Sequence, residues 1–199
     1  MSFRSTPAFP PHRPAAFTLA VVFLAASLLA GCSSSSENAS VEEGYSGPCL
    51  ELTPAGAPAT ETVTMQEGAG STCDILEVDV MVTDVSDVIN VNFQLTFDSS
   101  VVTFDGYSTS GSFLGSAPDL MEFVETPNPD TVIVSLTQIL RTGGDATGTE
   151  PVIRLTFLRA ADTGSADISF TGGAMLVAQP RGTTLDLEWF GGLLNVILI

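Results

Sequence analysis

The stretch Leu76–Tyr107, LEVDVMVTDVSDVINVNFQLTFDSSVVTFDGY, decides the fold of this chain. Its first run, up to Thr83, alternates apolar and polar residues, and a second run, Asn90–Phe97, does the same. A period of two places successive side chains on opposite faces of a strand, so each run predicts a strand with one buried and one solvated face. Short polar turns are expected between the runs, and Asp98–Ser100 turns the chain into a third strand, Val101–Tyr107. Such alternation is typical of antiparallel sheets.

The rest of the chain carries further short alternating segments, joined by turns rich in Gly, Pro and Asp. No segment shows helical periodicity over three turns, and no repeat of fixed period is present. This pattern predicts an all-β fold, a two-sheet antiparallel β-sandwich. Further strands are expected at 61–66, 120–124, 132–137, 153–158, 166–170, 174–178, 185–190 and 193–199, with a turn at Thr126–Asp130 and a loop at Arg141–Pro151.

The N-terminal segment has the features of an export signal. Basic residues precede the apolar run Ala15–Cys32, which is too short and wrongly ended for a membrane span. Its end, Leu29-Ala30-Gly31-Cys32, resembles the lipobox of bacterial lipoproteins, in which cleavage before the cysteine leaves a lipid-modified residue. An ordinary signal with a chance cysteine is the alternative.

The lipoprotein resemblance implies a membrane anchor at Cys32, since acyl chains on one residue give stable attachment. Ser33 follows the cysteine where an Asp would suggest the inner membrane, so the resemblance implies a bacterial outer-membrane or cell-surface location. The next residues are mostly Ser, Glu, Gly, Pro and Ala, a composition typical of a flexible tether. We therefore expect a signal peptide at 1–31, a tether at 32–60 and a folded domain at 61–199.

The chain is strongly acidic. It has 23 acidic and 6 basic residues, a formal net charge of −17, and all its acidic residues follow Cys32. A field of this sign repels nucleic acid, so no nucleic-acid partner is expected. A strongly acidic surface also keeps a protein soluble without serving any specific function. This is the favoured interpretation of the acidity.

Cys49 and Cys73 remain once Cys32 is assigned to the anchor, and an even pair in an exported protein predicts a disulfide. Free thiols are the alternative. Two cysteines without histidine do not make a zinc site. Calcium could use oxygens of Asp145, Thr147 and Glu150, but a plain surface loop is favoured, and no metal or cofactor is expected.

No histidine or lysine follows the signal segment. Triads, Cys–His pairs and Schiff-base chemistry therefore lack their residues. A pair of carboxylates could still act on a glycosidic bond. Acidic residues scattered over turns and outward strand positions are, however, what a solvated surface requires, so the chain is expected not to be an enzyme.

Two surfaces are candidates for binding. Asn90, Asn92, Gln94 and Thr96 form an outward row that is polar but uncharged, and charge depletion is a mark of protein interfaces. An ordinary wet sheet face is the alternative. Carbohydrate binding would need exposed aromatic planes, for which the candidates are Trp189, Phe190, Tyr107 and Tyr45. Trp189 and Phe190, which precede Gly191-Gly192, are expected to form a core plug rather than a sugar platform.

Two segments, INVNFQLTFDSSVVTFDGYSTSGSFL from Ile89 and PVIRLTFLRAADTGSADISF from Pro151, resemble strands and turns of cohesin domains. The resemblance extends over about residues 61–199. It implies a jelly-roll sandwich of nine strands, related to bacterial cellulose-binding modules, that holds a dockerin module through a flat sheet face. In the matching strand the family has an Asn and an Asp two positions apart, and this chain has Asn90 and Asn92 there.

The expected function is therefore a lipid-anchored protein whose cohesin-like domain binds a dockerin-like protein without catalysis. The contact residues would be the row Asn90, Asn92, Gln94 and Thr96. The chain has no dockerin-type calcium loop of its own, so such a loop would belong to the partner. A polysaccharide-binding module on the same fold is the alternative.

Overall fold

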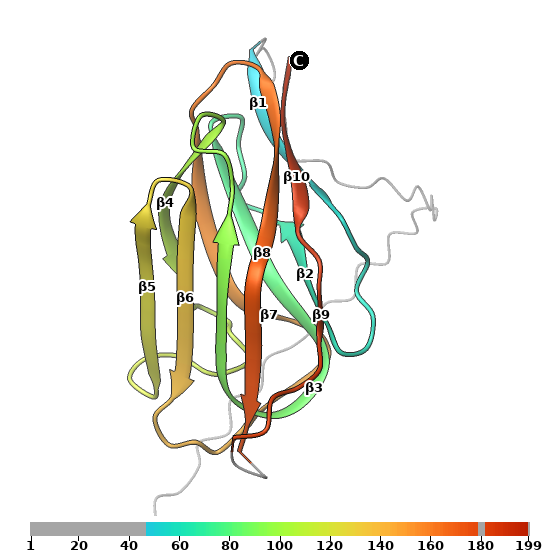
Figure 1. Ribbon diagram of the computed structural model, residues 1–199, viewed down its shortest axis with the longest axis vertical. Helices are drawn as coiled ribbons and strands as arrows, with labels where there is room; N and C mark the ends of the chain where they lie inside the picture. The colour runs from blue at the N-terminus through green and yellow to red at the C-terminus, as the bar shows by residue number, and fades with distance from the viewer. Residues whose placement is uncertain (1–46, 179–181, 199) are drawn as a thin grey trace, which may run out of the picture. The chain divides into compact units, whose positions relative to one another are not determined.

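The computed structural model describes residues 47–178 and 182–198, which form ten strands and no helix (Figure 1). Within these residues no helix could cross a membrane. The expected signal peptide, Cys32, Tyr45 and the first part of the tether lie outside the described residues. The strands are β1 Pro48–Pro54, β2 Thr62–Glu67, β3 Ile75–Thr96, β4 Val102–Ser108, β5 Leu120–Asn128, β6 Thr131–Gln138, β7 Gly144–Arg159, β8 Gly164–Val177, β9 Glu188–Trp189 and β10 Gly192–Leu198.

The long strand β3 belongs to both layers of the sandwich. Its first part pairs with β2 on one side and β7 on the other, while its second part pairs with β6 and β8. Strand β4 extends the first layer beyond β7, and β5 extends the second beyond β6 (Figure 1). Strands β10 and β1 continue from β8. The fold is an all-β, jelly-roll β-sandwich, as the alternation and the family resemblance predicted.

The polar segment inside β3 is not a turn, and the prediction of two separate strands was wrong. Asp84 and Asp87 have φ values of 51° and 59°, in the left-handed region. The β3–β7 ladder shifts register around Val85 and between Val85 and Val88, as at β-bulges. Both valines are buried. The chain therefore bends there from one layer into the other and stays hydrogen-bonded.

Other boundaries also differ from expectation. Strand β1 lies inside the predicted tether, because Leu50 and Leu52 bury their side chains and the strand has β10 to pair with. Strand β7 already begins at Gly144 within the predicted loop, because this segment pairs with the bulged part of β3. The predicted turn at 126–130 is shorter, since β5 continues to Asn128. The two expected strands at 166–178 form one strand, β8.

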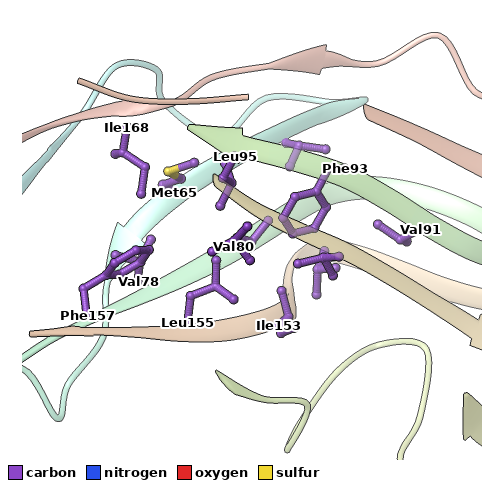
Figure 2. Close-up of a cluster of buried hydrophobic side chains, with 14 of the residues drawn as sticks. Met65, Val78, Val80, Val91, Phe93, Leu95, Ile153, Leu155, Phe157 and Ile168 are labelled. Atoms are coloured by element: carbon purple, nitrogen blue, oxygen red, sulfur yellow. The ribbon is translucent and has the colours of Figure 1, made fainter. Parts of the chain in front are cut away.

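The inward residues of both layers close over a single apolar core (Figure 2). Phe93 and Leu95 from the second part of β3 meet Leu155 and Phe157 from β7, and these four side chains are at most 3% exposed. The ring of Phe157 makes edge contacts with Phe97 and Phe104. Burial of this kind contributes about 1.5–3 kcal/mol per large side chain, so the inward residues of the alternating runs stabilise the fold.

Candidate protein-binding face

The row Asn90, Asn92, Gln94 and Thr96 lies on the outer face of the second layer. Each of the four is half-buried, while the alternate residues of the strand are buried. Because β3 lies between β6 and β8, the row runs along the middle of this face rather than its edge. We call the outer surface of β5, β6, β3 and β8 the β5–β8 face.

Hydrogen bonds fix the two asparagines in place. The Asn92 side-chain amide donates to Oδ1 of Asn90 at 3.0 Å. The Asn90 amide in turn donates to the Leu136 carbonyl at 3.1 Å and to the Thr137 hydroxyl at 2.7 Å. In the described part of the chain, no hydrogen bond is found for the Gln94 side-chain amide, which leaves it available to a partner. The two asparagine amides are therefore already ordered, so they lose little conformational entropy when a partner binds.

An exposed apolar group lies beside this row, on β5 and just after the end of β6. The sheet register aligns Asn92 with Ser135 of β6 and Ser135 with Phe123 of β5. Met121 is 59% exposed, Phe123 51% and Ile139, just beyond β6, 58%. With Leu140, these residues make up four of the eight exposed large hydrophobic residues in the described part of the chain. Exposed apolar clusters of this kind mark interaction sites.

Sequence reasoning did not identify these apolar residues as part of a site. Leu120, Met121, Phe123 and Val124 are all apolar, so both faces of β5 read as candidates for burial. Only the sheet register shows that Leu120 points inward and that Met121 and Phe123 point out. Their proximity to Asn92 depends on the long-range pairing of β3 with β6, which no local pattern reveals.

Charge is confined to the margins of the face. Asp119 and Glu125 flank the apolar group on β5. Beyond Thr96, three carboxylates line an open hollow of about 410 Å³. Two of them, Asp98 and Asp130, have pKa values below the usual range, because the hydroxyl and backbone groups of Ser100 and Ser99 hydrogen-bond to them. The centre of the face is therefore neutral and this end remains negative at physiological pH.

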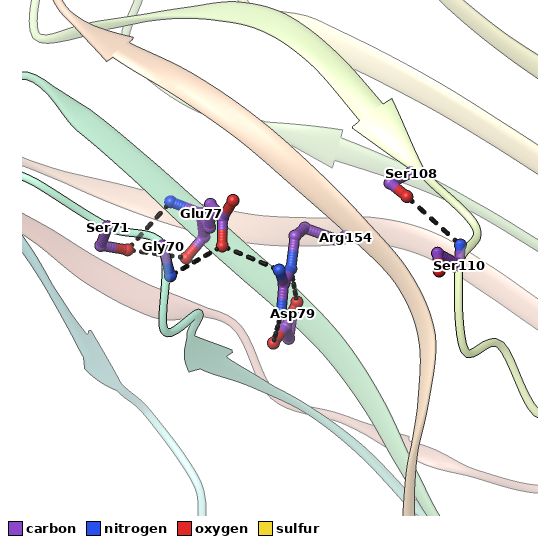
Figure 3. A network of polar contacts seen from close by, with 7 residues as sticks. All are labelled: Gly70, Ser71, Glu77, Asp79, Ser108, Ser110 and Arg154. Carbon is purple, nitrogen blue, oxygen red and sulfur yellow. Dashed lines mark hydrogen bonds and ion pairs between the residues drawn. The ribbon is translucent and has the colours of Figure 1, made fainter.

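The outer face of the other layer differs in chemistry. Arg154 of β7 lies between two carboxylates of β3, with Nη1 2.9 Å from Glu77 and Nε 2.6 Å from Asp79 (Figure 3). A second bond from Nη2 to Asp79 at 3.0 Å makes that pair bidentate. The Asp79 hydrogen bonds raise the pKa of Arg154. The guanidinium is thus paired with carboxylates of the same sheet.

The remaining candidate residues fall in separate places. Cys49 and Cys73 are joined in a disulfide. Asp145, Thr147 and Glu150 lie in strand β7 rather than in a loop, and Oδ1 of Asp145 accepts the backbone N–H of Asp87. Within the described residues no group of three His, Cys, Asp or Glu side chains could hold a metal ion.

Three of the aromatic candidates for sugar binding lie in the described residues, and they come from different parts of the fold. Trp189 is half-buried and packs against Phe93 and Phe170, with ring centroids 6.0 and 5.0 Å away, as the core-plug reading expected. Phe190 is also half-buried, and its ring lies against Gly56. Tyr107, on β4, is the exposed one of the three. Partial desolvation of its hydroxyl and the nearby Glu122 carboxylate raise the pKa of Tyr107.

Comparisons with known proteins identify the fold. No protein-family model and no curated protein matches the chain. Its shape is similar to solved cohesin structures. The CaCohA2 cohesin from Clostridium acetobutylicum aligns with a TM-score of 0.51 at 13% identity, over 77% of this chain and 92% of that one. The seventh ScaB type I cohesin from Pseudobacteroides cellulosolvens gives 0.51 at 10% identity, over 76% and 94%.

A third similar structure is described as a type I cohesin–dockerin complex, Coh-OlpA-Doc918, from Clostridium thermocellum. It aligns with a TM-score of 0.51 at 12% identity, covering 73% of this chain and 96% of that one. At such identities the likeness concerns the fold alone. The chain therefore has the fold of cohesin domains, and its function has to be argued from its own surface.

Proposed function

We propose that this chain is a non-catalytic protein-binding domain that holds a dockerin-like module on its β5–β8 face. The observation that carries the proposal is the composition of that face. It has an ordered, uncharged amide row beside exposed Met121 and Phe123, in a chain of net charge −17. Interface cores are depleted of charge and enriched in Met and aromatic residues, whereas a purely solvated sheet face in so acidic a chain would carry carboxylates.

The fold gives this surface the rigidity that recognition needs. Strand β3 pairs with β6 on one side and with β8 on the other along the row, so the backbone that carries the row is held on both sides. A solved cohesin of the same fold is described in a complex with a dockerin, which supports the choice of partner class. Polar contacts from Asn90, Asn92 and Gln94 would set orientation, and Phe123 would supply most of the buried apolar area.

Hydroxyl-radical footprinting of the wild-type protein tests the location of the contact. Met121 and Phe123 are exposed and oxidise readily, so their oxidation should fall several-fold when a captured partner is bound. Ile75, which is 38% exposed, and Tyr107, which is 42% exposed and lies on β4 of the other layer, serve as internal controls and should oxidise at an unchanged rate. Protection of Ile75 or Tyr107 without protection of Phe123 would place the partner elsewhere.

We further propose that the domain is attached to the outer membrane or cell surface of a bacterium through a lipid on Cys32. The lipobox-like sequence and the tether composition support this. A Cys32→Ser variant should move from the membrane fraction to the soluble secreted fraction, because one residue carries all the acyl chains. A variant that stays membrane-bound would show that another element holds the protein.

A further inference from the structure

The first strand of the domain is an edge strand that a single partner strand holds in the sheet. Within residues 47–178 and 182–198, β1 pairs with β10 alone, so it lies at the end of the hydrogen-bonded path. It contributes Leu50 and Leu52 to the core, and the residues that join it to β2, 55–61, are nearly all exposed. Edge strands with few buried side chains are the parts of a fold that open first.

On its other side, β1 has contacts to the end of β2 and to the segment that follows it. The backbone N–H of Leu50 donates to the Cys73 carbonyl at 3.2 Å. The N–H of Leu52 donates to Oε2 of Glu67 at 3.2 Å. The third is the disulfide between Cys49 and Cys73. Cys49 is the second residue of β1, and Cys73 lies two residues before the start of β3.

We infer that the Cys49–Cys73 disulfide is a redox latch, which keeps β1 docked when oxidised and lets β1 detach as a local unit when reduced. A dithiol reductant opens it. One of its thiolates attacks a sulfur of the bridge, the second closes the reductant into a cyclic disulfide, and the protein gains two electrons and two protons as two thiols. The two hydrogen bonds to Leu50 and Leu52 then have no covalent support.

The position of the latch determines what it protects. Pro48 pairs with Leu198 and Cys49 with Ile197, so fraying from the N-terminal end passes one rung before it reaches the bridge. When the latch is closed, a pull on the preceding residues goes through Cys73 to β3, the central strand. When it is open, the same pull removes β1 and uncovers the edge of β10, an unpaired sheet edge. The lipid anchor proposed above would be the source of such a pull. The latch itself does not depend on the anchor.

Native-state hydrogen exchange on the full chain tests the latch. The reporters are the amides of Leu50 and Leu52 in β1, compared with those of Val91 and Leu95 in β3. In the oxidised protein the two sets should be protected to a similar degree. After reduction with dithiothreitol, the β1 amides should exchange about a hundredfold faster relative to the β3 amides, as expected for opening of a local unit. The ratio, not the absolute rate, is the readout, because general destabilisation speeds both sets equally.

The double variant Cys49→Ser/Cys73→Ser is the matched control, and its ratio should equal that of the reduced protein with or without reductant. Far-UV circular dichroism should show that the sheet persists in the reduced wild type. An unchanged ratio after reduction would overturn the latch. Loss of the whole sheet on reduction would overturn it as well, since β1 would then not be a separable unit.

Discussion

Replacing Phe157 with Ala is expected to lower the free energy of unfolding by about 3–5 kcal/mol, the range for deleting a buried aromatic ring. Phe157 is fully buried and contacts the rings of Phe97 and Phe104, with centroids 5.2 and 5.8 Å apart. Its loss leaves a cavity between the two layers that rigid strands cannot collapse to fill. Urea unfolding followed by circular dichroism measures the change.

The same substitution at an exposed phenylalanine is the control. Phe123→Ala removes an equal volume from the β5–β8 face, where the ring is 51% exposed, and should change the unfolding free energy by roughly 0.5 kcal/mol or less. Similar losses for Phe123→Ala and Phe157→Ala would contradict the assignment of inner and outer faces.

Replacing Arg154 with Met is expected to destabilise the domain by about 2–3 kcal/mol, at or below the lower end of the roughly 3–5 kcal/mol for removing one partner of a fully buried ion pair. Methionine keeps the packing of the aliphatic stem but leaves the Asp79 carboxylate without its partner. The Asp79 side chain is only 12% exposed, so water cannot fully solvate its charge. The Arg154 side chain is 39% exposed, so a loss at the upper end of that range is not expected. Thermal or urea unfolding at neutral pH measures the change.

Arg159 offers a matched comparison on the same strand. It also pairs with two carboxylates, but Asp74 and Asp162 are 66% and 89% exposed, so water can solvate them once the guanidinium is gone. Arg159→Met should therefore cost about 1 kcal/mol or less. If Arg159→Met proved as harmful as Arg154→Met, the burial of Asp79 would not be the source of the effect.

The sandwich could be predicted from the sequence because alternation in β3, β6 and β7 is a local signal of which residues are buried. The period of two puts Phe93 and Leu95 on one face of their strand and Leu155 and Phe157 on one face of theirs, and all four are buried. The continuity of β3 could not be predicted, because the Thr83–Asp87 segment has the composition of a turn. Two left-handed aspartates and pairing to β7 turn it into a bulge instead.

The candidate face was predictable in part. The outward row on β3 follows from its period of two. The apolar side chains of β5 were not assigned to the site, because that strand is apolar on both faces and its inner side is set only by pairing with β6. Strand β1 was missed for a related reason, since seven residues within a polar segment form a strand only because β10 lies beside them.

The binding constant for a partner isolated from the source organism, measured for three variants, tests the proposed function most directly. Asn92→Arg places a charged side chain in the amide row, and Phe123→Ser removes the exposed ring; each should weaken binding by roughly thirtyfold or more, the loss expected for an interface hot spot. Thr103→Arg adds the same charge at an exposed position of β4, in the other layer, and should bind as the wild type does. Unchanged binding by Asn92→Arg and Phe123→Ser, or loss of binding by Thr103→Arg, would contradict the account.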